Sequence, residues 1–233
     1  MSLAVVTGVS SGIGEATARL LLSDGWQVRG WDIGEPRIPG VTWTRVDVSD
    51  PDSVATAAAE VEAVGLLVNA AGIADRAPAA TMRADQWRRV IDVDLSGTFY
   101  CAQALHPALK AGTGVVVNVA SIAGHRAFAG RANYCAAKAG VVMLTQVLGQ
   151  EWATDGIRVM AVSPGFVATE MVVAGIDGGW VSESAIRGRT PMDRLADPDE
   201  IARTILALSG EAFSYATGTT VLVDGGWTAN GGF

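Results

Sequence analysis

Short runs of Val, Ile and Leu alternate along the 233 residues with longer, alanine-rich stretches of helical periodicity. Several of the short runs are apolar almost throughout, which is typical of strands buried on both faces. Such alternation builds right-handed strand–helix–strand units, whose strands assemble into a parallel sheet covered by helices. The sequence therefore predicts an α/β fold of the Rossmann type, a doubly wound parallel sheet of about seven strands in a single domain, 1–233.

The spacing of these patterns places the individual elements. We expect strands at 3–7, 27–31, 42–46, 66–69, 114–120, 158–163 and 220–223, and helices at 12–24, 51–63, 83–110, 133–155 and 198–209. Asp50 and Asp197 each precede a proline, which favours a helix start with an aspartate N-cap. The segment 169–195 has little periodicity and several glycines, so we expect a loop or a mobile lid there.

Composition and charge exclude several classes of protein. The net charge of −7 argues against nucleic acid as a partner, because phosphate binding needs clustered Lys and Arg. The sequence contains no apolar run of about 20 residues, the length that a membrane span requires, and no secretory signal is expected at its start. Cys101 and Cys135 provide no disulfide or zinc framework, and we expect no metal site. A cytoplasmic protein is the default expectation.

Three glycines mark a candidate phosphate-binding turn. Gly8, Gly12 and Gly14 stand between the first expected strand and the first expected helix. Glycines there permit a tight turn and a close approach of the backbone, and the helix N-terminus presents free N–H groups to a pyrophosphate. The same trio also occurs in ordinary strand–helix turns, so the motif needs support from its context.

Asp32 supplies that context. It ends the second expected strand, 24 residues after Gly8. A carboxylate at this place accepts hydrogen bonds from ribose hydroxyls and repels a 2′-phosphate. No arginine lies in the glycine turn or directly after Asp32. The combination favours NAD over NADP as the cofactor.

A second set of residues indicates acid–base chemistry. Tyr134 and Lys138 are four residues apart in an expected helix, so they share one face of it. A tyrosine is a poor acid or base near neutrality, and a neighbouring ammonium favours its phenolate form. Ser121 follows the strand 114–120, at the sheet edge where open α/β sheets bind ligands, and its hydroxyl can donate to a substrate oxygen.

These motifs, taken in order, resemble the short-chain dehydrogenase/reductase family over nearly the whole chain. The matching segments are the turn Thr7-Gly8-x-x-x-Gly12-x-Gly14, the pair Asp47-Val48, the sequence Asn69-Ala70-Ala71-Gly72, the set Ser121, Tyr134 and Lys138, the segment from Pro164 to Thr169, and Asp224-Gly225-Gly226. The second residue of the Asn-Ala-Ala-Gly sequence is an alanine where the family usually has asparagine.

The resemblance implies a role for each matching residue. Tyr134 transfers the proton, Ser121 orients the substrate oxygen, and Lys138 binds the nicotinamide ribose and favours the phenolate of Tyr134. The residues expected to bind NAD are Gly8, Ser10, Ser11, Gly12, Ile13, Gly14, Asp32, Ile33, Asp47, Val48, Asn69, Ala70, Ala71, Gly72, Tyr134, Lys138, Pro164, Gly165, Val167 and Thr169. The resemblance also implies a homotetramer built on the helices 83–110 and 133–155.

Two departures from the family pattern stand out. Asp94 occupies the position at which the family usually places an asparagine as its fourth catalytic residue, and we expect it to brace the helix without chemistry of its own. The stretch between Asp32 and Val41 is too short for the helix that the family has there, which affects only local cofactor contacts.

The predicted function is an NAD-dependent oxidoreductase that interconverts a secondary alcohol and its ketone, whose identity the sequence does not reveal. The alternative is a dinucleotide-sensing protein that has lost turnover, which only Asp94 favours. A dehalogenase-type lyase and an enoyl reductase fit less well, since the former usually lacks the glycine turn and the latter has a wider Tyr–Lys spacing.

Several further side chains are candidates for the substrate pocket. Phe128, Phe166 and Met171 make it mainly apolar, and Trp180 and Trp227 are candidates for its mouth. His125 is interpreted either as facing the substrate or as bonded within its loop, and His106 as structural. Arg126 and Arg131 leave an acidic substrate open.

Overall fold

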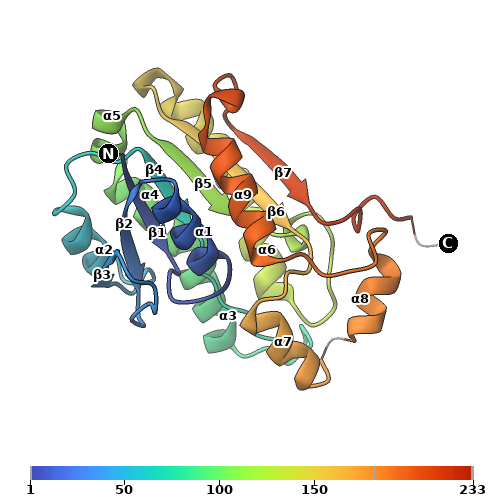
Figure 1. Cartoon of the computed structure of the whole chain (residues 1–233). Coiled ribbons are helices and arrows are strands. Elements are labelled where there is room, and N and C mark those ends of the chain that lie inside the picture. The colour runs from blue at the N-terminus through green and yellow to red at the C-terminus, as the bar shows by residue number, and fades with distance from the viewer. Residues whose placement is uncertain (1, 181, 232–233) are drawn as a thin grey trace.

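A computed structural model describes residues 2–180 and 182–231 of the chain. This part of the chain contains seven strands that form one parallel sheet in the order β3-β2-β1-β4-β5-β6-β7 (Figure 1). The strands are β1 (Leu3–Thr7), β2 (Gln27–Asp32), β3 (Val41–Arg45), β4 (Leu66–Asn69), β5 (Val115–Val119), β6 (Arg158–Pro164) and β7 (Thr219–Val223). The predicted Rossmann-type sheet of about seven strands is confirmed.

Helices cover both faces of this sheet. On one face α1 (Gly12–Ser23) and α9 (Pro198–Ser209) lie side by side, in front of the strands in Figure 1. The opposite face packs against α2 (Pro51–Ala58), α4 (Gly97–Ala104), α5 (His106–Gly112) and α6 (Ala132–Trp152). A further helix, α3 (Ala84–Ile91), packs against α6. Two short helices, α7 (Glu170–Asp177) and α8 (Glu183–Arg189), follow β6.

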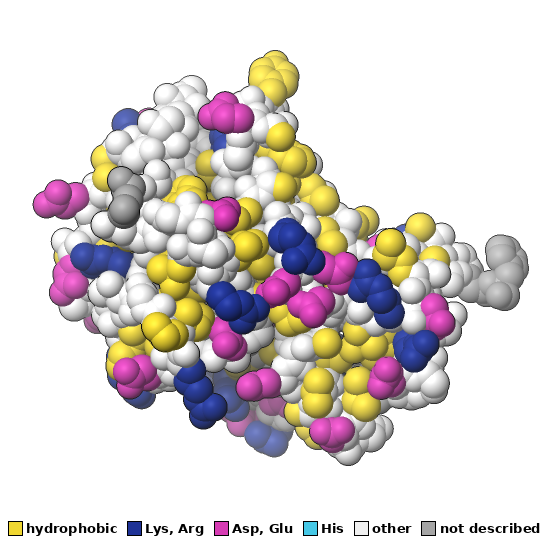
Figure 2. Space-filling model, in the orientation of Figure 1, with side chains coloured by type: hydrophobic (Ala, Val, Ile, Leu, Met, Phe, Trp, Pro, Cys, Tyr) yellow, Lys and Arg dark blue, Asp and Glu magenta, His cyan; other side chains and the backbone are white. Residues whose placement is uncertain are grey.

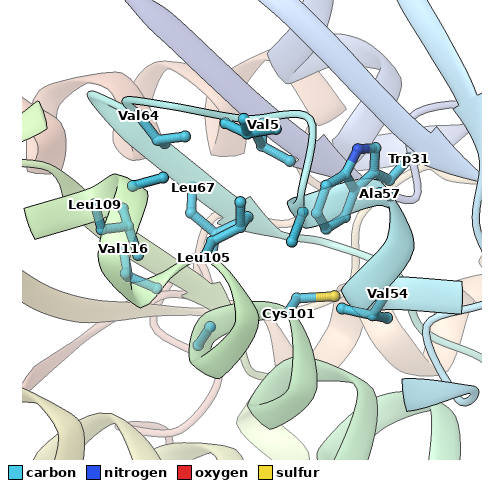
Figure 3. Packing of buried hydrophobic residues seen from close by; sticks show 14 of the residues in the cluster. Val5, Trp31, Val54, Ala57, Val64, Leu67, Cys101, Leu105, Leu109 and Val116 are labelled. Carbon is cyan, nitrogen blue, oxygen red and sulfur yellow. The ribbon is translucent and has the colours of Figure 1, made fainter. Parts of the chain in front are cut away.

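The core consists of two apolar layers, one on each side of the sheet. Because neighbouring residues of a strand point to opposite faces, Val5 lies in the layer beneath α2, α4 and α5, whereas Ala4 and Val6 lie in the layer beneath α1 and α9. Figure 3 shows the first layer, in which Leu105 of the chain between α4 and α5 packs among side chains of the sheet. Burial on both faces explains why the strands are apolar almost throughout.

The two predicted aspartate N-caps are confirmed. An Asp50 carboxylate oxygen accepts a hydrogen bond from Asp52 N at 3.0 Å, and Asp197 accepts one from Asp199 N at 2.8 Å. At α9 the Glu200 carboxylate also accepts from Asp197 N at 2.9 Å, which completes a capping box. Arg194 lowers the pKa of Glu200 to about 2 through a hydrogen-bonded ion pair.

Two predicted helices differ clearly from the structure in their bounds. The expected helix 83–110 is divided into α3, a π-helical segment (Asp92–Ser96), α4 and α5, and the last break falls just before Pro107, whose ring cannot continue the hydrogen-bond ladder. The expected helix 51–63 ends at Ala58, because the chain then turns to enter β4 and Val64 N bonds to Ala108 O.

The prediction of a loop over 169–195 is wrong for most of that segment. It contains α7 and α8, whose periodicity is obscured by glycines. Ser182 begins α8 as an N-cap, with its hydroxyl accepting from Ala185 N at 3.3 Å. Val181, between the two helices, lies outside the described residues. Whether the segment acts as a lid stays a prediction.

Charges of both signs are interspersed over the face that carries α1 and α9 (Figure 2). Several of them form ion pairs, among them Arg19 with Asp199, and Arg194 with Glu200 at 2.7 Å. In the described part of the chain, no helix combines the length and the apolar character needed to cross a membrane.

The core packing leads to a stability prediction. Leu105 is fully buried, so Leu105→Ala should lower the free energy of unfolding by about 2–5 kcal/mol through the cavity that it leaves. Denaturant titration measures this change. The matched control is Leu222→Ala, because Leu222 is 45% exposed and its loss should cost no more than about 0.5 kcal/mol. Equal losses in the two variants would contradict the packing described.

Candidate active site

A cavity of about 560 Å³ opens at the carboxyl ends of the parallel strands. Its lining residues follow β1, β2, β4, β5 and β6, and α7 contributes Glu170, Met171 and Val172. The strand order reverses between β1 and β4, and a sheet of this kind binds ligands at that switch point. The sheet topology therefore brings side chains that are distant in sequence to one site.

The predicted glycine turn lies in the wall of this cavity. Gly8 has φ +68°, and a Cβ atom on it would lie 2.8 Å from the backbone of Ala71, so only glycine fits there. The turn leads into α1, whose N-cap Ser11 makes no side-chain cap hydrogen bond. The first N–H groups of a helix have no intrahelical partners. They form a cradle whose donors suit a dinucleotide pyrophosphate.

Gly14, the third glycine of the turn, has a packing role in this structure. It lies outside the residues that line the cavity, and a Cβ atom on it would come within 2.1 Å of the Gly8 carbonyl oxygen. Gly14 thus permits the close contact of α1 with the end of β1, and it supports the turn from behind.

Asp32 lies at the end of β2 and lines the cavity, as predicted. One of its carboxylate oxygens accepts hydrogen bonds from Ser10 N at 3.0 Å and Ser10 Oγ at 2.8 Å. The other accepts from Gly34 N at 2.9 Å. These contacts fix the carboxylate beside the glycine turn, so the acid and the phosphate-binding turn form one unit.

Most of the other residues predicted to bind the cofactor also line the cavity. They are Ser10, Ser11, Gly12, Ile13, Ile33, Asp47, Val48, Ala70, Ala71, Gly72, Pro164, Gly165, Val167 and Thr169. Asn69 does not. Its side chain is buried and donates to Asn118 Oδ1 at 2.9 Å, which links the ends of β4 and β5.

Ser121, Tyr134 and Lys138 all line the same cavity, as the spacing predicted. Ser121 directly precedes a short 3₁₀ turn (Ile122–Gly124), and its Oγ accepts a hydrogen bond from Ala123 N at 3.1 Å. Tyr134 and Lys138 come from the first turns of α6, and the Lys138 ammonium lies 5.7 Å from the centre of the Tyr134 ring. The cavity thus brings a hydroxyl, a phenol and an ammonium together.

Lys138 is buried, with 5% of its surface exposed, and it is held from two sides. Its Nζ donates to the Val119 carbonyl oxygen at 3.0 Å and lies 3.2 Å from an Asp94 carboxylate oxygen. Burial alone would lower the pKa of Lys138, but the charges of Asp94 and Tyr134 outweigh it, so the pKa is raised. The raised pKa favours the charged form of Lys138 in the wall of the cavity.

Asp94 is fully buried and lies in the π-helical segment between α3 and α4. Its second carboxylate oxygen accepts from Ile73 N at 2.8 Å, so the side chain ties the chain after β4 to α6. Burial raises the pKa of Asp94 above its usual range, and Lys138 offsets the shift only in part. The bracing contact agrees with the role expected for this residue. That it has no chemistry of its own stays a prediction.

Sequence reasoning missed Asn133, which positions Tyr134. It is fully buried, its Nδ2 donates to Gln86 O at 3.2 Å, and its Oδ1 accepts from Tyr134 N at 2.8 Å. Its place directly before the tyrosine was the available signal. The cavity also includes Ile73 and Arg89, which no motif indicated.

The aromatic residues expected at the pocket are placed differently. Phe128 stacks on Trp227 with ring centres 5.2 Å apart, Phe166 packs against both, and none of the three lines the cavity. Trp180 is exposed and likewise lies outside the lining. Of this group only Met171 lines the cavity. The rings of Phe128, Phe166 and Trp227 pack against one another instead.

The remaining histidines and cysteines have structural contacts. His125 Nε2 lies 2.9 Å from Ser163 Oγ, and His106 pairs with Asp155 at 3.0 Å. Both cysteines are free, and burial raises the pKa of the Cys101 thiol to about 12. These contacts agree with the structural interpretation of His106.

Comparison with known proteins places the chain in a family. A family model described as enoyl-(acyl carrier protein) reductase matches residues 8–228. Cis-4-hydroxycyclohexanecarboxylate dehydrogenase of Sinomonas cyclohexanicum is 43% identical, over 97% of this chain and 96% of that protein. Galactitol 2-dehydrogenase (L-tagatose-forming) of Cereibacter sphaeroides is 38% identical, over 97% and 94%. The chain belongs to the short-chain dehydrogenase/reductase family and is an oxidoreductase.

Solved structures of similar fold support the dinucleotide cradle. Aldohexose dehydrogenase of Thermoplasma acidophilum has a TM-score of 0.94 at 28% identity, covering 100% of this chain and 96% of that one. ElxO with NADP bound (TM-score 0.90, 27% identical) and 4-hydroxyisoleucine dehydrogenase complexed with NADH (TM-score 0.92, 26% identical) each cover 98% of this chain and are themselves covered to 99%. One of these neighbours therefore binds NADP and the other binds NADH.

The ion pair leads to a prediction for Asp94→Asn. The amide keeps the shape and one acceptor oxygen, so kcat/KM should stay within about tenfold of wild type, or about 1.4 kcal/mol of barrier. Without the carboxylate, the charge of Lys138 acts on Tyr134 alone and favours its phenolate. The pH profile of alcohol oxidation should therefore move slightly to lower pH.

The measurement is kcat/KM against pH for wild type, Asp94→Asn and the control Asp92→Asn. Asp92 lies in the same π-helical segment but is exposed, so its profile should match wild type. A loss of a hundredfold or more at every pH in Asp94→Asn would show that the carboxylate itself is required.

Proposed function

We propose that this protein is an NAD-dependent dehydrogenase/reductase that interconverts a secondary alcohol and its ketone, with Tyr134 as the general acid and base. The observation that carries the proposal is the shared cavity. A glycine turn with a fixed acid at one end and the group of Ser121, Tyr134 and Lys138 at the other line one continuous space.

The residues of this chain divide the work between binding and proton transfer. Ser121 donates a hydrogen bond to the substrate oxygen and polarises it. Tyr134 gives its proton to that oxygen during reduction and removes it during oxidation. Lys138, held by Asp94 and Val119, places a positive charge beside the phenol and favours the form that accepts the proton. When bound, the nicotinamide supplies or accepts the hydride.

The preference for NAD rests on Asp32. Its carboxylate is fixed at the cavity wall by three hydrogen bonds, and a 2′-phosphate there would meet an uncompensated negative charge. The guanidinium of Arg45 lies near the residue after Asp32, where it donates a hydrogen bond to the Ile33 carbonyl oxygen at 2.8 Å.

The homotetramer stays a prediction. It is supported by the exposed apolar side chains of Met143 and Val147 on α6.

The substrates to test follow from the reactions for which the two relatives are named. A panel of a simple cyclic ketone, 4-oxocyclohexanecarboxylate and L-tagatose covers these classes. An enoyl thioester is added because the matching family model is described as an enoyl-(acyl carrier protein) reductase. Consumption of NADH with a ketone, and none with the enoyl thioester, is the expected result.

The first prediction concerns the cofactor. Wild type should show a higher kcat/KM with NADH than with NADPH. Asp32→Ala should bring the two values closer together, because it weakens the binding of NADH and removes the repulsion of the NADPH 2′-phosphate. The control is Glu35→Ala, which removes the same charge from an exposed residue outside the cavity and should leave the ratio unchanged. A wild-type preference for NADPH would refute the assignment.

The second prediction concerns proton transfer. Tyr134→Phe should lower kcat by about 10²–10⁴-fold, the usual contribution of a general acid, and leave the affinity for NADH nearly unchanged. Fluorescence titration gives the affinity, and Tyr100→Phe is the control, since Tyr100 packs against the core and lies outside the cavity lining. If Tyr134→Phe kept more than about a tenth of the activity, the loss would be too small for a general acid, and Tyr134 would have no part in the reaction.

A further inference from the structure

We infer that the substrate of this enzyme is a hydroxy acid or keto acid, whose carboxylate binds to Arg131 and Arg76 beside Tyr134. This inference rests on the proposed function, because it names the class of alcohol or ketone that the same site accepts. The two arginines come from segments that are distant in sequence. The fold places the Arg76 guanidinium beside Gly130, the residue before Arg131, at the start of the helix whose Tyr134 and Lys138 line the cavity.

Arg131 is placed by the start of α6. It is the N-cap residue of that helix, three positions before Tyr134, and its carbonyl accepts from Cys135 N at 2.9 Å. Its own N–H donates to Phe128 O at 3.2 Å. The backbone is thus fixed on both sides, and the half-buried side chain starts one helical turn before the phenol.

Arg76 approaches from the stretch that follows β4. Ile73, three residues earlier, lines the cavity and donates to Asp94. The Arg76 guanidinium lies over Gly130, with Nε and Nη2 each 3.9 Å from the position that a Cβ atom would take there. A hydrogen bond of 3.1 Å from Ala77 N to Gly130 O holds the two segments together.

Neither of the two guanidinium groups has a carboxylate partner in the described part of the chain. Within residues 2–180 and 182–231, the Arg131 side chain makes no hydrogen bond or ion pair, and Arg76 donates only to the Trp180 carbonyl oxygen, at 2.6 Å. The adjacent Asp75 is occupied by Gln86 Nε2, at 3.2 and 3.3 Å. Burial and the charge of Arg76 lower the pKa of Arg131. Tyr134 and Cys135 act in the opposite direction but offset this lowering only in part.

Within the part of the chain that the structure describes, several other arginines have the acidic partner that Arg131 and Arg76 lack. Arg19, Arg83, Arg187 and Arg194 each form an ion pair with an aspartate or glutamate. Arg131 is half-buried and Arg76 is exposed, and two like charges this close to each other repel unless an anion joins them. A planar carboxylate fits, because guanidinium groups bind it through paired hydrogen bonds.

The position of the pair gives the carboxylate a function. Tyr134 marks where the reacting oxygen lies, and Arg131 stands on the same helix one turn away. An acid group bound there fixes the end of the substrate that does not react. This contact thereby selects substrates that carry an acid group and orients their carbinol carbon. Because it is the same in the ground state and the transition state, it contributes to binding and not to the chemical step.

The test uses two ketones that differ in charge alone, 4-oxocyclohexanecarboxylate and its carboxamide, with wild type, Arg131→Met and Arg131→Lys. Wild type should prefer the carboxylate, and Arg131→Met should lose about ten- to a hundredfold in kcat/KM for it, the value of a hydrogen bond to a charged group. The loss should lie in KM, spare the carboxamide, and be partly restored in Arg131→Lys.

The control is Arg126→Met. Arg126 is exposed and donates to the carbonyls of His125 and Thr228, so its loss should leave the carboxylate-to-carboxamide ratio unchanged. If wild type reduces both ketones equally well, the inference is overturned while the proposed function stands. The same holds if Arg131→Met and Arg126→Met change the carboxylate-to-carboxamide ratio of kcat/KM alike.

A binding measurement separates the two ideas further. Calorimetric titration of the NADH complex with cyclohexanecarboxylate, which does not react, should give binding that Arg131→Met weakens about tenfold or more. If no ketone is reduced but this binding is found, the proposed function fails and the carboxylate site remains. Equal affinity in wild type and Arg131→Met overturns the carboxylate site.

Discussion

The buried ammonium of Lys138 imposes the strictest condition on this structure. A lysine can be charged in the interior only if its partners compensate for the lost water. Here Asp94 and the Val119 carbonyl do so, and they come from the π-helical segment and the end of β5. The chain after β4 must also approach closely, and Gly72 permits it, since a Cβ atom there would lie 3.2 Å from the Asp94 carboxylate. Four segments therefore converge on one charge.

The parallel sheet explains why that charge lies where a cofactor and a substrate can reach it. Both faces of the sheet are covered by helices, so only the strand ends remain open for binding. At the carboxyl ends the chain between β1 and α1 and the chain after β4 diverge at the switch point. The glycine turn and the acid–base group then become opposite ends of the same cavity.

Features encoded by neighbouring residues were predictable from the sequence. The glycine turn, Asp32 and the pair Tyr134 and Lys138 depend on local spacing and on the edge of the sheet that they follow. The N-caps Asp50 and Asp197 were found for the same reason, because a capping residue contacts only its own helix. The parallel sheet of about seven strands followed from the strand–helix alternation, whereas the order of its strands was not predicted.

Features that depend on contacts across the fold were not predictable from the sequence. The ion pair between Asp94 and Lys138 and the position of Arg76 beside Gly130, next to Arg131, join residues far apart in the chain. The rings of Phe128, Phe166 and Trp227 pack against one another, which places these expected pocket residues in an aromatic cluster outside the cavity. The helices α7 and α8 were missed because their glycines and short length hide any periodicity.

The central claim is that one cavity passes hydride directly between a nicotinamide and a substrate carbon, while Tyr134 moves the proton. Reduction of the fastest ketone in the panel with NADH deuterated at both C4 positions tests it, with the product examined by mass spectrometry and NMR. The account predicts one deuterium on the carbinol carbon, carried there without exchange with water. Unlabelled product, or no reduction of any ketone in the panel, would contradict it.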